Sequence, residues 1–196
     1  MFLTSLSMVV LRVVSFTVNI VSIGVLHRYL DPVAFGLWLT LSSFWLVLVL
    51  FGDMGMAGSV VNGVARAAAV GDWIAARRVV SSTLPLLVII SSVLSFAFVI
   101  LSLTLPWASV LRIYRPEIES QFPIAFMAMA LSTALTPITG LAPAVMKGLQ
   151  RGYAGNLLVS ACFLLALGAL LVGTQVELSF AQLAITFYSV PAALLI

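Results

Sequence analysis

Apolar residues occupy long, nearly unbroken runs along this chain, and polar residues gather in short stretches between them. A transmembrane helix rises about 1.5 Å per residue and needs about 20 apolar residues to cross roughly 30 Å of hydrocarbon. The runs are continuous rather than alternating with a period of two, which argues against the strands of a membrane barrel. The pattern therefore predicts an all-α bundle of about six transmembrane helices, over residues 4–29, 33–52, 79–104, 122–145, 156–174 and 179–196.

The composition supports a membrane protein and excludes several other classes. Hydrophobic residues make up 63% of the chain and charged residues 8%, whereas a soluble domain has about 25% charged residues. A net charge of +3 is too small and too dispersed to indicate nucleic-acid binding. One His and one Cys provide neither a disulfide nor a metal-ligand set, and the loops are too short for a catalytic site. We expect no cofactor, no metal and no enzymatic activity.

The placement of Lys and Arg predicts the orientation of the chain. The cytoplasmic side of a multi-pass protein carries the excess of these residues. With the N-terminus in the cytoplasm, that side holds Arg12, Arg66, Arg77, Arg78, Lys147 and Arg151, and the other side holds Arg28, Arg112 and Arg115. A cytoplasmic N-terminus is therefore favoured.

Arg12 is a charge within the first predicted span. The 14 uncharged residues from Val13 to Leu26 form about 21 Å of helix, which puts Arg12 roughly 4–9 Å inside the cytoplasmic edge. The stripe Arg12–Ser15–Asn19–Ser22 follows one helix face, expected to face protein or water. Arg12 either faces a polar cavity and binds an anion, or it snorkels to the headgroups. Asn19 either lines that cavity or hydrogen-bonds to a neighbouring helix.

Asp53 follows the uncharged run Val33–Gly52, whose 20 residues suffice to cross the bilayer once. Asp53 is therefore expected at the cytoplasmic boundary, in a glycine-flanked turn or paired with nearby arginines. The alternative is a gating or coupling acid at the cytoplasmic mouth. Asn62 and Arg66 lie one helical turn apart and indicate a short helix, and Asp72 is a helix-start signal before the third span.

Four motifs between the predicted spans carry a resemblance. They are Arg28-x-Leu30-x-Pro32-x-x-Phe35-Gly36-x-Trp38, then "DMG" at 53–55, "GDWIAARRVVSST" at 71–83 and "KGLQRGYAGN" at 147–156. In this order and at these positions they resemble polysaccharide flippases of the multidrug/oligosaccharidyl-lipid/polysaccharide exporter superfamily. Members of that family carry twelve to fourteen spans in two six-helix lobes. The resemblance implies that residues 1–196 form a single six-helix N-terminal lobe, expected to be truncated at its C-terminus.

The resemblance also implies a function. Such a protein translocates a polyprenyl-diphosphate-linked oligosaccharide across the bacterial cytoplasmic membrane by alternating access, for the biosynthesis of lipopolysaccharide, O-antigen or exopolysaccharide. Its cations would pair with the diphosphate, and Lys147, Gln150 and Arg151 would either meet the substrate at the cytoplasmic mouth or only set the topology. The substrate-path candidates are Arg12, Ser15, Asn19, Asp53, Asn62, Arg66, Lys147, Gln150 and Arg151.

The partners that the resemblance implies are the lipid-linked oligosaccharide, the lipid bilayer, a second lobe or second chain, and polysaccharide polymerase and chain-length proteins. One alternative is a cation-coupled multidrug exporter of the same superfamily. Such exporters often carry an acid in the first span, and residues 4–29 contain none. The other alternative is a non-transporting, truncated membrane subunit.

Overall fold

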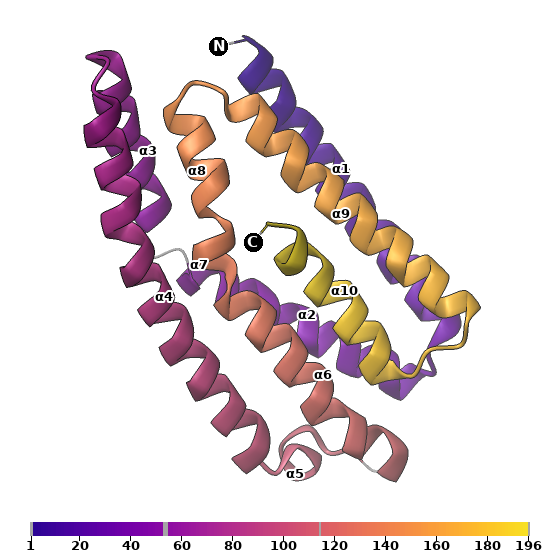
Figure 1. Ribbon diagram of the computed structural model, residues 1–196. Helices are drawn as coiled ribbons and strands as arrows, with labels where there is room; N and C mark the ends of the chain where they lie inside the picture. The colour runs from indigo at the N-terminus through magenta and orange to yellow at the C-terminus, as the bar shows by residue number, and fades with distance from the viewer. Residues whose placement is uncertain (1, 53–54, 114, 196) are drawn as a thin grey trace.

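The apolar runs fold into helices throughout the computed structural model (Figure 1). It describes residues 2–52, 55–113 and 115–195, and the side chains of residues 3–49, 55–113 and 115–190. In these residues the helices are α1 (Phe2–Tyr29), α2 (Pro32–Gly52), α3 (Met56–Ala69), α4 (Trp73–Thr104), α5 (Trp107–Leu111), α6 (Pro116–Ala134), α7 (Thr136–Thr139), α8 (Leu141–Gly148), α9 (Gly152–Gln175) and α10 (Phe180–Leu195).

Five helical stretches are long and apolar enough to cross a membrane, so the chain is an all-α, multi-pass membrane protein. They are Leu3–Tyr29, Pro32–Val49, Trp73–Thr104, Pro116–Gly148 and Gly152–Gln175. The apolar part of α10, Phe180–Val190, is shorter. The sixth predicted span, over residues 179–196, therefore stays a prediction.

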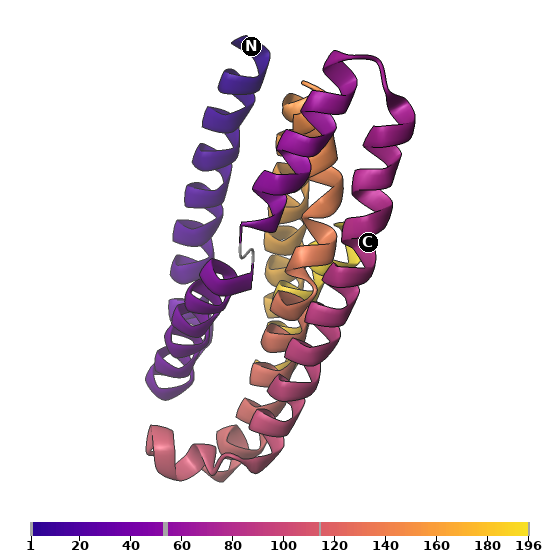
Figure 2. The ribbon, with the colours of Figure 1, turned by 90° about the vertical axis from the view of Figure 1, so that its left-hand side faces the viewer.

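Successive helices run back and forth between two ends of the molecule (Figures 1 and 2). The start of α1, the α3–α4 turn and the α8–α9 turn lie at one end, which we call the N-terminal end. The α1–α2 turn, α5 and the α9–α10 turn lie at the opposite end. The helix α2, which ends at Gly52, and the helix α3, which begins at Met56, follow one another toward the N-terminal end (Figure 2).

The predicted connection over residues 53–78 contains more helix than we expected. The short helix inferred from Asn62 and Arg66 is confirmed, as the 14-residue α3. Asp72 caps α4, as predicted, because its Oδ1 accepts a hydrogen bond of 2.8 Å from the backbone N–H of Ala75. The third apolar helix therefore begins at Trp73, several residues before its apolar run.

Two hydrogen bonds fix the register of α1 beside α9 and the turn that follows it; α9 is the helix against which α1 mainly packs. Asn156 donates through Nδ2 to Ser7 Oγ at 3.0 Å, and Tyr29 donates through its hydroxyl to the Leu178 carbonyl at 2.9 Å. Both pairs join residues 149 positions apart, so the two helices run parallel and keep the same register along their length. Each residue of α1 therefore lies level with the residue 149 positions later in the chain.

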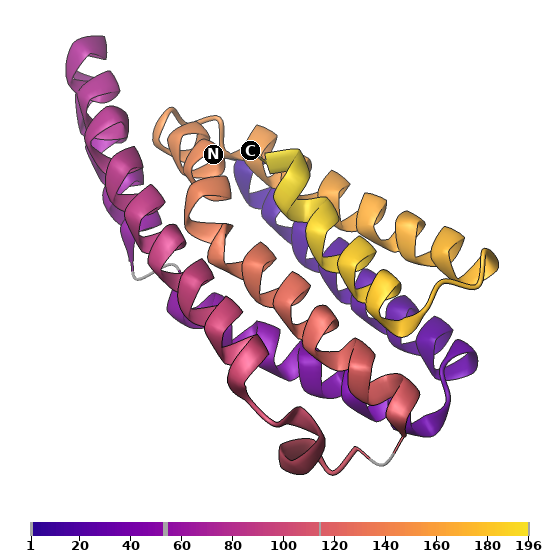
Figure 3. The same cartoon turned by 60° about the horizontal axis from the view of Figure 1, so that its bottom comes forward.

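Two separate apolar cores hold the helices together. The larger core joins α2, α6 and α10 and is rich in aromatic rings. In it Trp38 stacks on Tyr188, with ring centroids 5.8 Å apart. Figure 3 shows α10 lying between α6 and α9, the two helices against which it mainly packs. The smaller core joins α3, α4 and α8 nearer the N-terminal end, around Val60, Val64 and Ala144.

Candidate functional site

One face of α1 carries polar residues in its N-terminal half and middle and an apolar residue near its C-terminal end. Arg12, Asn19 and Leu26 lie seven residues apart and therefore on the same face. Leu26 is fully buried in the larger core, to which α2 also contributes Ala34. Arg12 and Asn19 are exposed. Figure 2 shows the reason: α1 and α2 meet at the opposite end, whereas α3 stands apart from the N-terminal half of α1.

The pairing with α9 gives the depth of this polar face. Residues Gly152 to Val176 carry no charge, and Leu164 lies at the middle of this run, level with Ser15 of α1. A hydrocarbon layer of about 30 Å centred on the run puts Ser15 at the midplane and Arg12 about 10 Å below the nearer surface. That depth slightly exceeds the 4–9 Å expected from the sequence. The expected value was counted from a hydrocarbon edge placed at the end of α1, whereas this one is counted from a hydrocarbon layer centred on the uncharged run of α9.

Ser15 and Asn19 are partly satisfied by their own helix. Ser15 Oγ donates to the Arg12 carbonyl at 3.0 Å, and Asn19 Nδ2 donates to the Ser15 carbonyl at 3.1 Å. Such bonds to a preceding turn let short polar side chains lie in apolar surroundings at little cost. The hydrogen bonds that the structure gives for these two side chains therefore stay within α1 and do not reach a neighbouring helix.

The guanidinium of Arg12 has no such partner among the side chains and backbone groups that the structure describes. Among the described residues the one ion pair joins Arg115 to Asp31, at 3.0 Å and at the opposite end. Placing an arginine near the bilayer centre costs about 3 kcal/mol on insertion scales. An unpaired cation at this depth needs water or a bound anion, which makes Arg12 the strongest single candidate on α1.

Charge is divided unequally between the two ends. In the described part of the chain, the N-terminal end carries Arg66, Arg77, Arg78, Lys147 and Arg151 with one acid, Asp72. The opposite end carries Arg28, Arg112 and Arg115 with Asp31, Glu117, Glu119 and Glu177. Asp72 caps α4 and forms no ion pair with these basic residues. The N-terminal end is therefore strongly cationic.

A cleft of about 510 Å³ opens at this cationic end between α3, the start of α4 and the α8–α9 turn. It is lined by Ala65, Ala68, Ala69, Trp73, Gly148, Leu149, Gln150 and Arg151. The backbone bond from Arg151 N–H to the Met146 carbonyl, at 2.8 Å, closes the turn, and Gln150 takes a left-handed conformation with φ of 59°. The structure thus brings Gln150 and Arg151 together on one cavity.

The remaining path candidates are distributed around this cleft. Arg66 and Lys147 are exposed and adjoin the lining residues Ala65 and Gly148. Asn62 is exposed one turn along α3 from Arg66, on the side opposite the buried Val60 and Val64, so it does not line the cleft. The structure therefore gives two groups, one on α1 and one at the cationic end.

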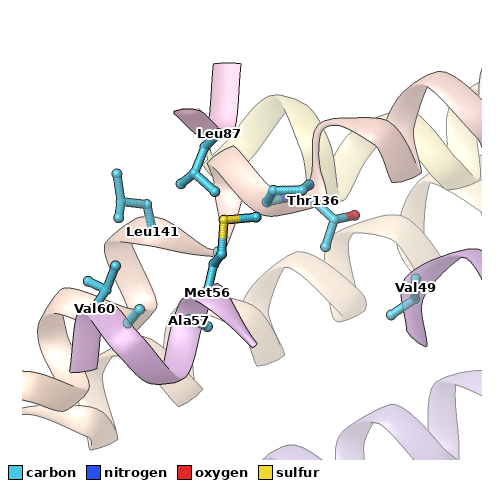
Figure 4. Close-up of a pocket in the computed structure, with 10 residues that line it drawn as sticks. Val49, Met56, Ala57, Val60, Leu87, Thr136 and Leu141 are labelled. Carbon is cyan, nitrogen blue, oxygen red and sulfur yellow. The ribbon is translucent and has the colours of Figure 1, made fainter. Parts of the chain in front are cut away.

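A second, apolar cavity of about 130 Å³ lies where α2 and α3 meet α4, α7 and α8 (Figure 4). Met56 reaches into it toward Leu87 and Thr136. Leu87 lies nine residues from Arg78, about 13 Å along the helix, so this cavity is well inside the bilayer. Asp53 lies outside the described residues. Val49 of α2 and Met56 of α3 line this cavity.

Comparison of the chain with models of protein families, with curated protein sequences and with solved structures gives no match. The resemblance to polysaccharide flippases therefore remains an expectation from short motifs.

Of the residues that line the cleft, the sequence predicted only Gln150 and Arg151. Among those it missed is Trp73, which forms one wall although it begins α4, 77 positions before Gln150. Its signal in the sequence was a tryptophan beside the helix-start residue Asp72, close to the basic pair Arg77 and Arg78. An aromatic residue at such a place is typical of a membrane interface.

Proposed function

We propose that this chain translocates a polyprenyl-diphosphate-linked oligosaccharide across the bacterial cytoplasmic membrane, with Arg12 pairing with the diphosphate inside the bilayer. The observation that carries the proposal is the position of Arg12: about 10 Å deep on a polar face, with no acidic partner in the described residues. A diphosphate entering the hydrocarbon loses its hydration, and a cation at that depth offsets part of the cost.

Asn19, on the same face as Arg12, can bind the sugar part of the substrate. The carbonyl oxygen of Asn19 is left to accept a hydrogen bond from a sugar hydroxyl, since only its Nδ2 is bonded to the helix. The polyprenyl tail stays in the surrounding lipid and needs no protein path. With the N-terminal end in the cytoplasm, the five cations there would lie at the leaflet from which the substrate enters.

Alternating access needs a second wall opposite the polar face of α1. In the proposal a second lobe or a second copy of the chain supplies it, and the two units rock about the fixed polar face. The polymerase and chain-length proteins expected from the resemblance would take the product on the far side of the membrane.

The competing functions differ in what they need from α1. A cation-coupled multidrug exporter would use a carboxylate in the first span for ion binding. The described residues of α1 contain Arg12, His27 and Arg28 but no Asp or Glu. A non-transporting subunit needs no unpaired cation at mid-depth at all.

Proteoliposomes containing the purified chain test the proposal. The probe is a polyprenyl-diphosphate disaccharide with a fluorophore on the sugar, added to the outer leaflet. We expect protein-dependent movement of the fluorophore to the leaflet that an external reductant cannot reach, and no movement of the same sugar on a neutral polyprenyl lipid. Ethidium efflux driven by a Na⁺ or H⁺ gradient would instead support the exporter. Movement of none of these probes would support the non-transporting subunit.

A further inference from the structure

The tip of the α3–α4 hairpin exposes apolar side chains beyond the cations of the N-terminal end. Val70 is 79% exposed, Trp73 63% and Ile74 73%. Arg77 and Arg78 follow on α4, closer to the membrane centre. A soluble loop would bury or avoid such residues, whereas Trp at a membrane surface lies among lipid headgroups.

The dimensions of the tip match the headgroup layer. Five residues separate Trp73 from Arg78, which is about 7.5 Å of helix. The polar layer on each side of a bilayer is roughly 5–8 Å thick, taken from the difference between its full thickness and its hydrocarbon core. With Arg77 and Arg78 at the hydrocarbon surface, the tip therefore spans the headgroups and the cleft lies among them.

The chemistry of the cleft suits one class of headgroup. Gln150 and Arg151 offer a neutral amide and a guanidinium on one wall, and Trp73 forms another. Alanine and glycine residues on α3 and α8 form much of the remaining lining, which leaves room for a small group. Planar guanidinium groups bind phosphate oxygens in a bidentate manner, and an amide can bond to a glycerol hydroxyl.

We propose that this cleft binds the headgroup of an anionic phospholipid of the bilayer itself, a phosphodiester such as phosphoglycerol, with Arg151 on the phosphate and Trp73 beside the glycerol backbone. The bound lipid joins the α3–α4 tip to the α8–α9 turn, two parts of the chain that otherwise meet through the smaller core. The proposal does not depend on translocation, since lipid binding can be measured without transport.

The test uses the full chain in detergent, titrated with dioleoyl phosphatidylglycerol or with dioleoyl phosphatidylcholine, and bound lipid is counted by native mass spectrometry. We expect wild-type protein to retain phosphatidylglycerol in preference to phosphatidylcholine. The preference should fall about tenfold in Arg151→Gln, since a hydrogen bond to a charged group is lost. It should also fall in Trp73→Ala. Both residues are exposed at element ends, so these variants are expected to fold, which gel filtration and circular dichroism verify.

Arg28→Gln is the matched control, because Arg28 is also exposed and unpaired among the described residues but lies at the opposite end. It should leave the preference unchanged. Equal retention of the two lipids, or an undiminished preference in Arg151→Gln, would overturn the proposal. A polyprenyl diphosphate added as competitor should not displace phosphatidylglycerol from the cleft. Displacement would assign the cleft to the transported substrate instead.

Discussion

Replacing Arg12 with alanine is expected to slow translocation of the diphosphate-linked oligosaccharide by about 10- to 100-fold, the equivalent of one hydrogen bond to a charged group. The loss should be large because Arg12 is the cation of α1 that lies deep in the bilayer, and no described residue forms an ion pair with it. Arg12→Lys keeps the charge but not the planar fork, so it should retain an intermediate rate. The measurement is the fluorophore protection assay at equal protein per vesicle.

Arg28→Ala serves as the control for that series, because Arg28 lies in the last turn of α1, at the opposite end of the molecule. It should change the rate by less than about twofold, as expected for an exposed charge. A fully active Arg12→Ala protein would remove Arg12 from the mechanism. An equal loss of activity in Arg12→Ala and Arg12→Lys would indicate that Arg12 acts through packing rather than through its charge.

Gly148→Ala is expected to destabilise the contact between α3 and α8. A Cβ at Gly148 would lie 2.8 Å from Val64 Cβ and 3.0 Å from the Val61 carbonyl oxygen. Neither neighbour is the end of a flexible side chain, so a helix must shift, at a cost of about 1–3 kcal/mol. Because lipid is as apolar as the core, close packing is the main force that holds membrane helices together. The measurement is unfolding in mixed micelles with increasing denaturing detergent.

Gly58→Ala provides the matched control on the same pair of helices. Gly58 lies in α3, and a Cβ there would meet nothing within 4 Å. This change should be neutral or slightly stabilising, since alanine favours a helix by about 0.5–1 kcal/mol over glycine. Equal stabilities of the two variants would contradict the close packing of α8 on α3.

The sequence predicted the elements whose signal is local. Long apolar runs gave the all-α membrane class, and Asp72 gave the start of α4, because capping depends on residues three positions apart. The extent of α3 was less clear, since its apolar residues form only one face and Arg66 lies on the other. The predicted span 122–145 is divided into α6, α7 and α8, and Pro137 lies in the short α7 at that division.

The candidate site likewise has a part that follows from the sequence and a part that depends on tertiary packing. The shared face of Arg12, Ser15 and Asn19 follows from helix geometry alone. Helix geometry also gave a depth for Arg12, and the greater depth found here depends on the bond between Ser7 and Asn156, 149 positions apart. The cleft combines residues from α3, α4 and the α8–α9 turn, and only tertiary packing brings them together.

In the proposed mechanism the polar face of α1 opens to water inside the membrane rather than to lipid. Thiol accessibility tests this claim most directly, because thiol reagents need an ionised thiolate and hence water. The natural Cys162 is buried and is replaced by serine in the background protein. Asn19→Cys and Ile20→Cys then compare adjacent positions turned about 100° apart; Ile20 is itself 54% exposed, so burial in the protein does not protect it.

A charged, membrane-impermeant thiol reagent is added to proteoliposomes that hold each protein, and modification is followed over time. The account predicts rapid modification of Asn19→Cys and little or none of Ile20→Cys. Protection of both thiols, or equal modification of the two, would contradict it.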